Sequence, residues 1–254
     1  MNRLKKILLS VAFFMLILFA IVVIPEQKKG FRTQHFTIWF SSSIDTAKIA
    51  ALAVSLETNY SKISNDLKTT PAENIETNIY AARWRYIKET GNWSASGNIE
   101  GISKLHFLDQ TWGENDGKKV AIHEFAHTIT LKLLLDNESK SIQREAFDQK
   151  FSHFPTWLWE AISTYEADQF IDPKTLPYLD NGRYPRLEEL NRRLNGGKIY
   201  SCGYTIIEYI LFRFGQENLI KLIQNYGDIQ RVFNVSDEQF SRGWYEFVKL
   251  KYMK

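Results

Sequence analysis

One segment constrains this chain more than any other: His123-Glu124-Phe125-Ala126-His127. On an α-helix with 3.6 residues per turn, side chains four positions apart lie one above the other on the same face. Two imidazoles at that spacing can bind one metal ion between them, and the carboxylate beside the first can act as a base. The segment is therefore expected to fold as a helix with its polar face turned toward a shielded site.

A pattern with two free positions also arises by chance on an ordinary exposed helix. Around this one, apolar residues recur at roughly helical spacing: Val120, Phe125, Ala126, Ile129, Leu133 and Leu134. That spacing predicts a half-buried helix, and metal coordination gives the histidines a reason to be desolvated. We expect His123 and His127 to bind zinc, and Glu124 to take a proton from a zinc-bound water whose pKa is lowered to roughly 7. The pattern indicates hydrolytic chemistry.

A catalytic zinc site uses three protein ligands and leaves a fourth position for water, so a third ligand is needed. The metzincin pattern would require a glycine and a further histidine downstream of the motif. Thr130 and Leu133 occupy those two positions. The metzincin class is therefore excluded.

The segment Trp157 to Ala167 reads W-L-W-E-A-I-S-T-Y-E-A. It resembles the W-L-x-E-G-x-A-x-Y-x-E segment of gluzincin metallopeptidases, whose first glutamate is the third zinc ligand. The resemblance implies that Glu160 binds zinc. Glu166 is the competing candidate, and its ordinary reading is a solvated carboxylate near the helix end. Two residues stand where the family has glycine and alanine: Ala161 and Ser163.

The segment Tyr200 to Ile210 resembles the Y-x-x-G-x-x-x-x-x-Y-L helix start that follows the zinc site in the same superfamily. There the first tyrosine stabilises the tetrahedral intermediate, so the resemblance assigns that role to Tyr200. Tyr204 is the alternative. A phenol aimed at a developing oxyanion in a dry site stabilises the transition state.

From residue 101 to its end, the chain resembles gluzincin peptidases of the peptidase MA-like group. The gap between His127 and Glu160 is longer than in the best-known aminopeptidase branch, which implies a helix inserted within residues 138–149. The G-x-M-E-N motif of that branch reads a free amino terminus, and the sequence G-N-I-E-G at 97–101 imitates it poorly. Endopeptidase, aminopeptidase and non-peptide amide hydrolase therefore stay open. The resemblance implies a peptide or protein substrate and Zn²⁺ as the cofactor.

Periodicity predicts strands before the motif and helices after it. Strands are expected at 35–40, 75–87 and 102–108, and a helix capped by Asp45 follows the first. Later helices are expected at four places: Thr156–Gln169, Cys202–Phe214, Gln216–Asn225 and Asp237–Tyr252. The expected fold is α+β and, by resemblance, zincin-like, with an N-terminal mixed sheet and a C-terminal helical subdomain over residues 35–254. In that family the last strand before the zinc helix lies at the sheet edge and lines the cleft.

Residues 7–24 are apolar apart from Ser10. Eighteen helical residues span about 27 Å, enough to cross a hydrocarbon core. No small-x-small cleavage site is evident, which favours an uncleaved anchor over a signal peptide for residues 1–24, followed by a linker at 25–34. Three basic residues precede the run and three follow it: Arg3, Lys5 and Lys6, then Lys28, Lys29 and Arg32. The signal-like layout favours a single-pass cell-membrane protein with its catalytic domain outside the cytoplasm.

The first 24 residues hold three of the 32 basic residues and none of the 29 acidic ones, so the remainder is neutral. No basic patch with interleaved aromatics is present, and nucleic acid is not an expected partner. The single cysteine, Cys202, cannot form an intramolecular disulfide and is expected to be a small buried hydrophobe. The sequence does not indicate an oligomeric state.

A zincin-fold protein that binds or scaffolds with little turnover is the alternative to a peptidase. A structural zinc site is closed by four protein ligands and has no use for a general base. Here two histidines, one expected glutamate ligand and the additional carboxylate of Glu124 favour the enzyme.

Overall fold

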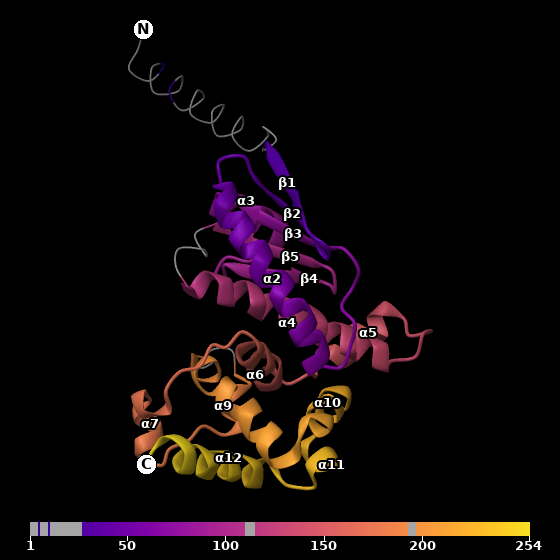
Figure 1. Cartoon of the computed structure of the whole chain (residues 1–254). Coiled ribbons are helices and arrows are strands. Elements are labelled where there is room, and N and C mark those ends of the chain that lie inside the picture. Colours follow the sequence, from indigo (N-terminus) through magenta and orange to yellow (C-terminus); the bar gives the residue numbers. More distant parts are fainter. Residues whose placement is uncertain (1–4, 6–9, 11–26, 110–114, 193–196) are drawn as a thin grey trace.

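The structure is a computed structural model that describes Lys5, Ser10 and residues 27–109, 115–192 and 197–254. An N-terminal half built around a mixed sheet is followed by a C-terminal half of helices (Figure 1). This is the α+β order that the sequence predicts. The apolar run 7–24 lies outside the described residues, apart from Ser10. Within the described part of the chain, no helix is long and apolar enough to cross a membrane.

Five strands form one sheet in the order β1-β2-β3-β5-β4. Their bounds are β1 Lys28–Arg32, β2 Phe36–Ser41, β3 Ile75–Tyr80, β4 Gly97–Glu100 and β5 Lys104–Leu108. Strands β2, β3 and β5 run parallel, whereas β1 and β4 are antiparallel to their neighbours at the two edges. Residues 28–32, expected within a linker, therefore extend the sheet instead.

One face of the sheet packs on two long helices, α2 (Thr46–Asp66) and α4 (Asn115–Asn137). In β2, the alternate residues Phe36 and Ile38 are fully buried on that face, as a side-chain period of two requires. Phe125, inside the histidine motif, meets Phe36 edge to face with ring centroids 5.2 Å apart. The motif is thus fixed to the core through one of its two free positions.

Helix α2 begins where the sequence predicts it. The Asp45 side chain accepts a hydrogen bond from the backbone N–H of Ala47 at 2.9 Å, which satisfies one of the free donors of the first turn. The predicted apolar stripe is buried at five positions: Ile49, Leu52, Ala53, Leu56 and Ile63.

The strand predicted at 75–87 ends at Tyr80, and helix α3 (Arg83–Thr90) follows it. The apolar residues beyond Tyr80 therefore belong to α3 and not to a longer strand. Tyr86 of α3 packs with Tyr80 and Leu108 in a small core separate from the main one.

The strand just ahead of α4 was expected at the sheet edge, and this prediction is wrong. That strand is β5, which lies between β3 and β4. The chain forms β4 first and turns at Gly101, whose φ is 62°, so that β5 returns antiparallel to β4 and joins β3. The edge strand beside α4 is therefore β4.

In the part that the structure describes, the C-terminal half consists of helices and one 3₁₀ turn. Their bounds are α5 Arg144–Phe151, α6 Thr156–Glu166, η2 Pro173–Thr175, α7 Pro177–Asp180, α8 Leu187–Leu190, α9 Gly197–Phe214, α10 Gln216–Gln224, α11 Ile229–Phe233 and α12 Asp237–Tyr252. The four predicted helices correspond to α6, α9, α10 and α12. Helix α9 begins earlier than predicted and α6 ends earlier. The inserted helix expected within 138–149 corresponds to α5, displaced toward the C-terminus.

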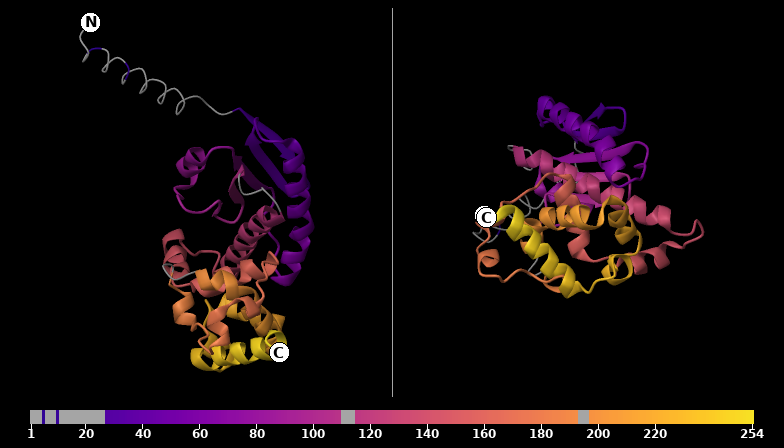
Figure 2. Two further views of the ribbon diagram at one scale, coloured as in Figure 1. Left: turned by 90° about the vertical axis from the view of Figure 1, so that its left-hand side faces the viewer. Right: turned by 60° about the horizontal axis from the view of Figure 1, so that its bottom comes forward.

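Helix α4 lies between the two halves, with the sheet on one side and α6 on the other (Figure 2). Helix α9 then packs closely on α6. A Cβ at Gly203 of α9 would lie 2.9 Å from Cα of Ala161, so glycine allows this approach. The motif helix and the helix carrying Glu160 are thereby held face to face.

Candidate metal centre

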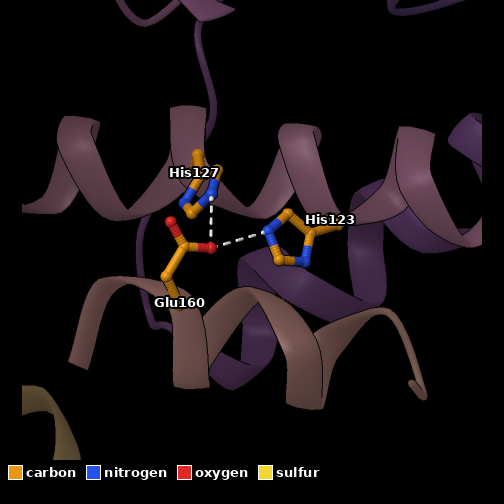
Figure 3. A group of neighbouring side chains, drawn as sticks. All are labelled: His123, His127 and Glu160. Atoms are coloured by element: carbon orange, nitrogen blue, oxygen red, sulfur yellow. Dashed lines mark hydrogen bonds and ion pairs between the residues drawn. The ribbon is translucent and has the colours of Figure 1, made fainter. Parts of the chain in front are cut away.

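Three side chains predicted as metal ligands meet at the junction of the two halves. His123 and His127 come from α4 and Glu160 from α6, and they point toward one another (Figure 3). Glu160 Oε2 lies 3.1 Å from His123 Nε2 and 3.7 Å from His127 Nε2. One ligand atom from each residue lies within 4.8 Å of the others. The donor set is two imidazoles and one carboxylate, which suits zinc.

The outer nitrogen of each imidazole has its own partner. His123 Nδ1–H donates to Gln169 Oε1 at 2.9 Å, and His127 Nδ1 shares a 2.7 Å hydrogen bond with Ser163 Oγ. Such partners fix the ring orientation and direct the opposite nitrogen inward. Both Nε2 atoms consequently face Glu160, so the residues present fit a zinc ion.

Gln169 reaches His123 because α6 ends where it does. Asp168 adopts a left-handed conformation with φ of 51°, and the Gln169 N–H donates to the carbonyl of Thr164 at 3.0 Å. This termination turns the chain back toward α4. Sequence reasoning extended the helix through this point and missed Gln169, and it noted Ser163 only as a departure from the family pattern.

Aromatic rings enclose the cluster on two sides. Trp159 stacks on His127 with centroids 4.3 Å apart and an interplanar angle of 7°. On the other side, the Tyr200 ring centroid lies 6.2 Å from that of His123. Trp157, by contrast, is buried in the core. Trp159 therefore packs on a candidate ligand.

The electrostatics of the cluster favour a carboxylate facing imidazoles. Burial opposes ionisation of Glu160, but hydrogen bonds and charge from His123 and His127 outweigh it and hold the pKa of this carboxyl well below its usual range. Burial also opposes the charged form of His123 and so acts to lower its pKa. The hydrogen bond to Glu160 and the charges of the nearby glutamates outweigh burial and raise this pKa overall. The pocket thus holds negative charge where a divalent cation would bind.

Glu124 lies beside the cluster under the edge strand. Burial raises the pKa of its carboxyl, and the charges of His127 and His123 only partly offset this effect. A Cβ at Gly97 of β4 would lie 2.7 Å from Cγ of Glu124, so the strand approaches this closely because it has glycine there. A carboxylate with a raised pKa is a stronger base near neutral pH.

Glu166, the competing ligand candidate, lies outside this cluster. Its side chain is 2% exposed, and it accepts a 2.6 Å hydrogen bond from Lys62 Nζ of α2. Burial raises its pKa to about 7 despite the lysine. It is thus a buried partner of Lys62 and not the solvated carboxylate that the sequence suggested.

A cleft of about 1220 Å³ opens over the cluster. Residues from both halves line it, among them Gly97, Asn98, Leu131, Phe151, Phe154, Gln169 and Tyr200. Tyr200 is 48% exposed on the cleft wall. Tyr204 instead packs against Tyr165 and Phe170, at centroid distances of 5.0 Å and 5.2 Å.

Two further titratable side chains lie apart from the cleft lining. Cys202 is buried as expected, and burial raises the pKa of its thiol to about 11. His106 on β5 is also buried and hydrogen-bonds Tyr80 Oη at 2.9 Å. Neither residue lines the cleft.

Solved structures of three longer proteins share part of this backbone arrangement. An M1 zinc metallopeptidase variant from Deinococcus radiodurans matches with 12% identity and a TM-score of 0.45, over 87% of this chain and 51% of its own. A two-domain M1 zinc metallopeptidase variant bound to L-arginine matches with 12% identity and a TM-score of 0.46, over 87% and 52%. An aminopeptidase N family protein from Idiomarina loihiensis matches with 12% identity and a TM-score of 0.42, over 90% and 42%.

This chain spans about half the length of the first two proteins. No family model and no curated protein matches it.

Proposed function

We propose that this chain is a zinc-dependent peptidase of the gluzincin type, with a zincin-like fold. The observation that carries the proposal is the meeting of His123, His127 and Glu160 in an open cleft, with Glu124 beside them. A closed structural site would have no use for that fourth group. The three residues are the proposed zinc ligands, and the cleft leaves room for a substrate.

Zinc bound there would supply Lewis-acid polarisation of a carbonyl and lower the pKa of a water. The chain's own groups carry the proton transfers. Glu124, with its raised pKa, accepts a proton from the attacking water and later gives it to the leaving amine. Gln169 and Ser163 hold the two imidazoles in place from behind.

Tyr200 is the proposed oxyanion donor, because its ring lies on the cleft wall beside His123 while Tyr204 packs elsewhere. An extended substrate would lie along β4, whose outer edge has no strand beside it among the described residues. Main-chain pairing there would place a peptide bond above Glu124. This assigns to β4 the role that the sequence gave to the strand before α4.

We further propose that residues 7–24 anchor the protein in the cell membrane, because this run is long and apolar, and that the cleft lies outside the cytoplasm, because the layout resembles that of a signal segment. Membrane fractionation with amino-terminal sequencing tests this. A mature form that starts near residue 26 and is released from membranes would show a cleaved signal instead.

The catalytic proposal is tested by measuring zinc content and hydrolysis of peptides with free and blocked amino termini. Glu124→Gln should keep zinc and lose about 10²- to 10⁴-fold in turnover, since the amide cannot accept the proton. Tyr200→Phe should lower kcat on the order of a hundredfold with KM little changed, and Tyr204→Phe is the matched control. Zinc-loaded wild type that cleaves nothing, like Glu124→Gln, would favour a binding protein.

A further inference from the structure

The two sides of the cleft differ in chemistry. On the side of β4 and α9, the lining includes Asn92, Ser96, Asn98, Gln169 and Tyr200. On the side of α5, it includes the apolar residues Leu131, Phe151, Phe154 and Trp159, which we call the α5 wall, beside the polar residues Asp148, Ser152 and Thr156. A substrate that fills the cleft therefore meets three aromatic rings and a leucine on the α5 side.

The α5 wall is continuous with the metal cluster. Trp159 stacks on His127, and Phe151 meets Trp159 edge to face at a centroid distance of 5.2 Å. Phe154 meets the same indole at 6.0 Å. A group bound against these rings lies next to the reacting bond, so the wall can select what is cleaved.

The wall is braced from behind, so the rings cannot simply collapse into the cleft. Phe147, which is buried, stacks with Phe151 at 6.1 Å. Phe154 is buried as well and contacts Tyr226 of the helical half at 6.2 Å. A preformed apolar surface binds an apolar group without first paying the entropy of ordering its own side chains.

Charge on this side is confined to the rim. Asp148 also lines the cleft, but its side chain is 63% exposed and lies 3.7 Å from Arg144 one turn earlier. A charged substrate group placed against the wall would lose hydration and gain no buried partner. An aromatic or branched aliphatic group would instead bury apolar surface and stack on the rings.

We propose that the α5 wall is a subsite for a bulky apolar side chain of a peptide substrate, an aromatic or branched aliphatic residue next to the bond that is cleaved. The inference rests on the proposed peptidase function. Phe151 is its central residue, because that ring lines the cleft without touching the candidate ligands. Burying one large apolar side chain corresponds to roughly 10- to 100-fold in kcat/KM over alanine.

The test uses the full chain, zinc-loaded, with two matched peptide sets, one with free and one with blocked amino termini. Within each set the peptides differ only at one position: phenylalanine, leucine, alanine or aspartate. Wild type should cleave next to phenylalanine and leucine at least tenfold faster than next to alanine, and slowest next to aspartate. Phe151→Ala should lower this preference several-fold while leaving zinc content unchanged. Phe151→Leu should restore most of it. Phe212→Ala is the control, because Phe212 is 75% exposed on α9 and does not line the cleft.

Binding of the same peptides to Glu124→Gln, measured by calorimetry, separates the two proposals. Cleavage without preference, or a preference that Phe151→Ala leaves intact, would overturn the subsite and leave the peptidase standing. A second outcome is that the phenylalanine peptide binds preferentially, that Phe151→Ala abolishes this preference, and that wild type cleaves none of the peptides. This outcome would support the subsite and contradict the peptidase. Neither binding nor cleavage would overturn both.

Discussion

Helix α6 holds one carboxylate near its start that is 14% exposed, Glu160, and one at its end that is 2% exposed, Glu166, and their environments are opposite. Near the start of the helix, Glu160 faces two imidazoles, which outweigh burial and lower its pKa. At the end, Glu166 has one ammonium group, from Lys62, with Asp66 nearby, and burial raises its pKa to about 7. Burial alone therefore does not set the pKa of a carboxyl, because the number of cationic or hydrogen-bonding partners around it also matters.

The largest expected effect is on zinc affinity, which should depend on Glu160 and not on Glu166. Glu160→Ala should reduce zinc affinity by more than the roughly 100-fold that losing an outer hydrogen-bond partner costs, since a proposed ligand is removed. Glu166→Gln should bind zinc as wild type does, because Glu166 pairs with Lys62 instead. Elemental analysis and competition with a chelator measure both. If Glu166→Gln lost the metal and Glu160→Ala kept it, the ligand assignment would be reversed.

The second prediction concerns stability at the Glu166 end. Its pKa of about 7 in the folded chain lies above the ordinary value of 4.5. Between these values the folded chain binds more protons, so this group's contribution to the free energy of unfolding falls as pH rises, by about 3 kcal/mol in all. The free energy of unfolding of Glu166→Gln should therefore rise relative to that of wild type between pH 4.5 and pH 8. Urea unfolding of both metal-free chains measures the difference, and a constant gap would contradict the prediction.

The third prediction concerns Ser163, which hydrogen-bonds the outer nitrogen of the candidate ligand His127. Ser163→Ala removes the hydrogen bond to His127 Nδ1 and should weaken zinc binding by roughly 10- to 100-fold. Ser163→Thr, which keeps the hydroxyl, should restore part of this affinity. Ser241→Ala is the matched control, because Ser241 is a buried serine on α12 whose hydroxyl has no hydrogen-bond partner among the described residues. Equal affinities for Ser163→Ala and Ser241→Ala would show that the bond does not orient the ring.

The smallest effect involves Glu124, the carboxylate beside the candidate metal ligands. Gly97→Ala would place a methyl group 2.7 Å from Cγ of Glu124 and displace the base. Turnover should fall about tenfold, since small misplacements of a catalytic group are costly, while zinc content stays unchanged. Gly197→Ala is the control, because a Cβ there meets no atom within 4 Å. Full activity in Gly97→Ala would mean that Glu124 moves aside without consequence.

Sequence reasoning predicted that His123 and His127 lie together because this part of the candidate site follows a local rule. The i, i+4 spacing of His123 and His127 fixes their relation on any helix, and Phe125 and Ala126 between them belong to the buried face. Glu160 came from resemblance to a family segment, and the structure brings it to the histidines. The helix order and the cap at Asp45 also follow from local patterns.

The rest depends on contacts between distant residues. Gln169 reaches His123 only because Asp168 adopts a left-handed φ, which no pattern in the sequence marked. The edge position of β4 follows from its hairpin with β5, and the early end of β3 from the packing of α3. The α5 wall could be expected only as an insertion, since its aromatic surface appears when α5 meets α6.

The candidate cluster joins α4, which packs on the sheet, to α6, which packs on α9. An ion held there would bind the native arrangement and not the unfolded chain, in which the three donors separate. Mass action then ties the unfolding equilibrium to the free ion concentration, by about 4 kcal/mol when that concentration is a thousand times the dissociation constant. A chelator should therefore lower the melting temperature as well as remove activity. The bound ion would link α4 to α6 and so stabilise the contact between the two halves.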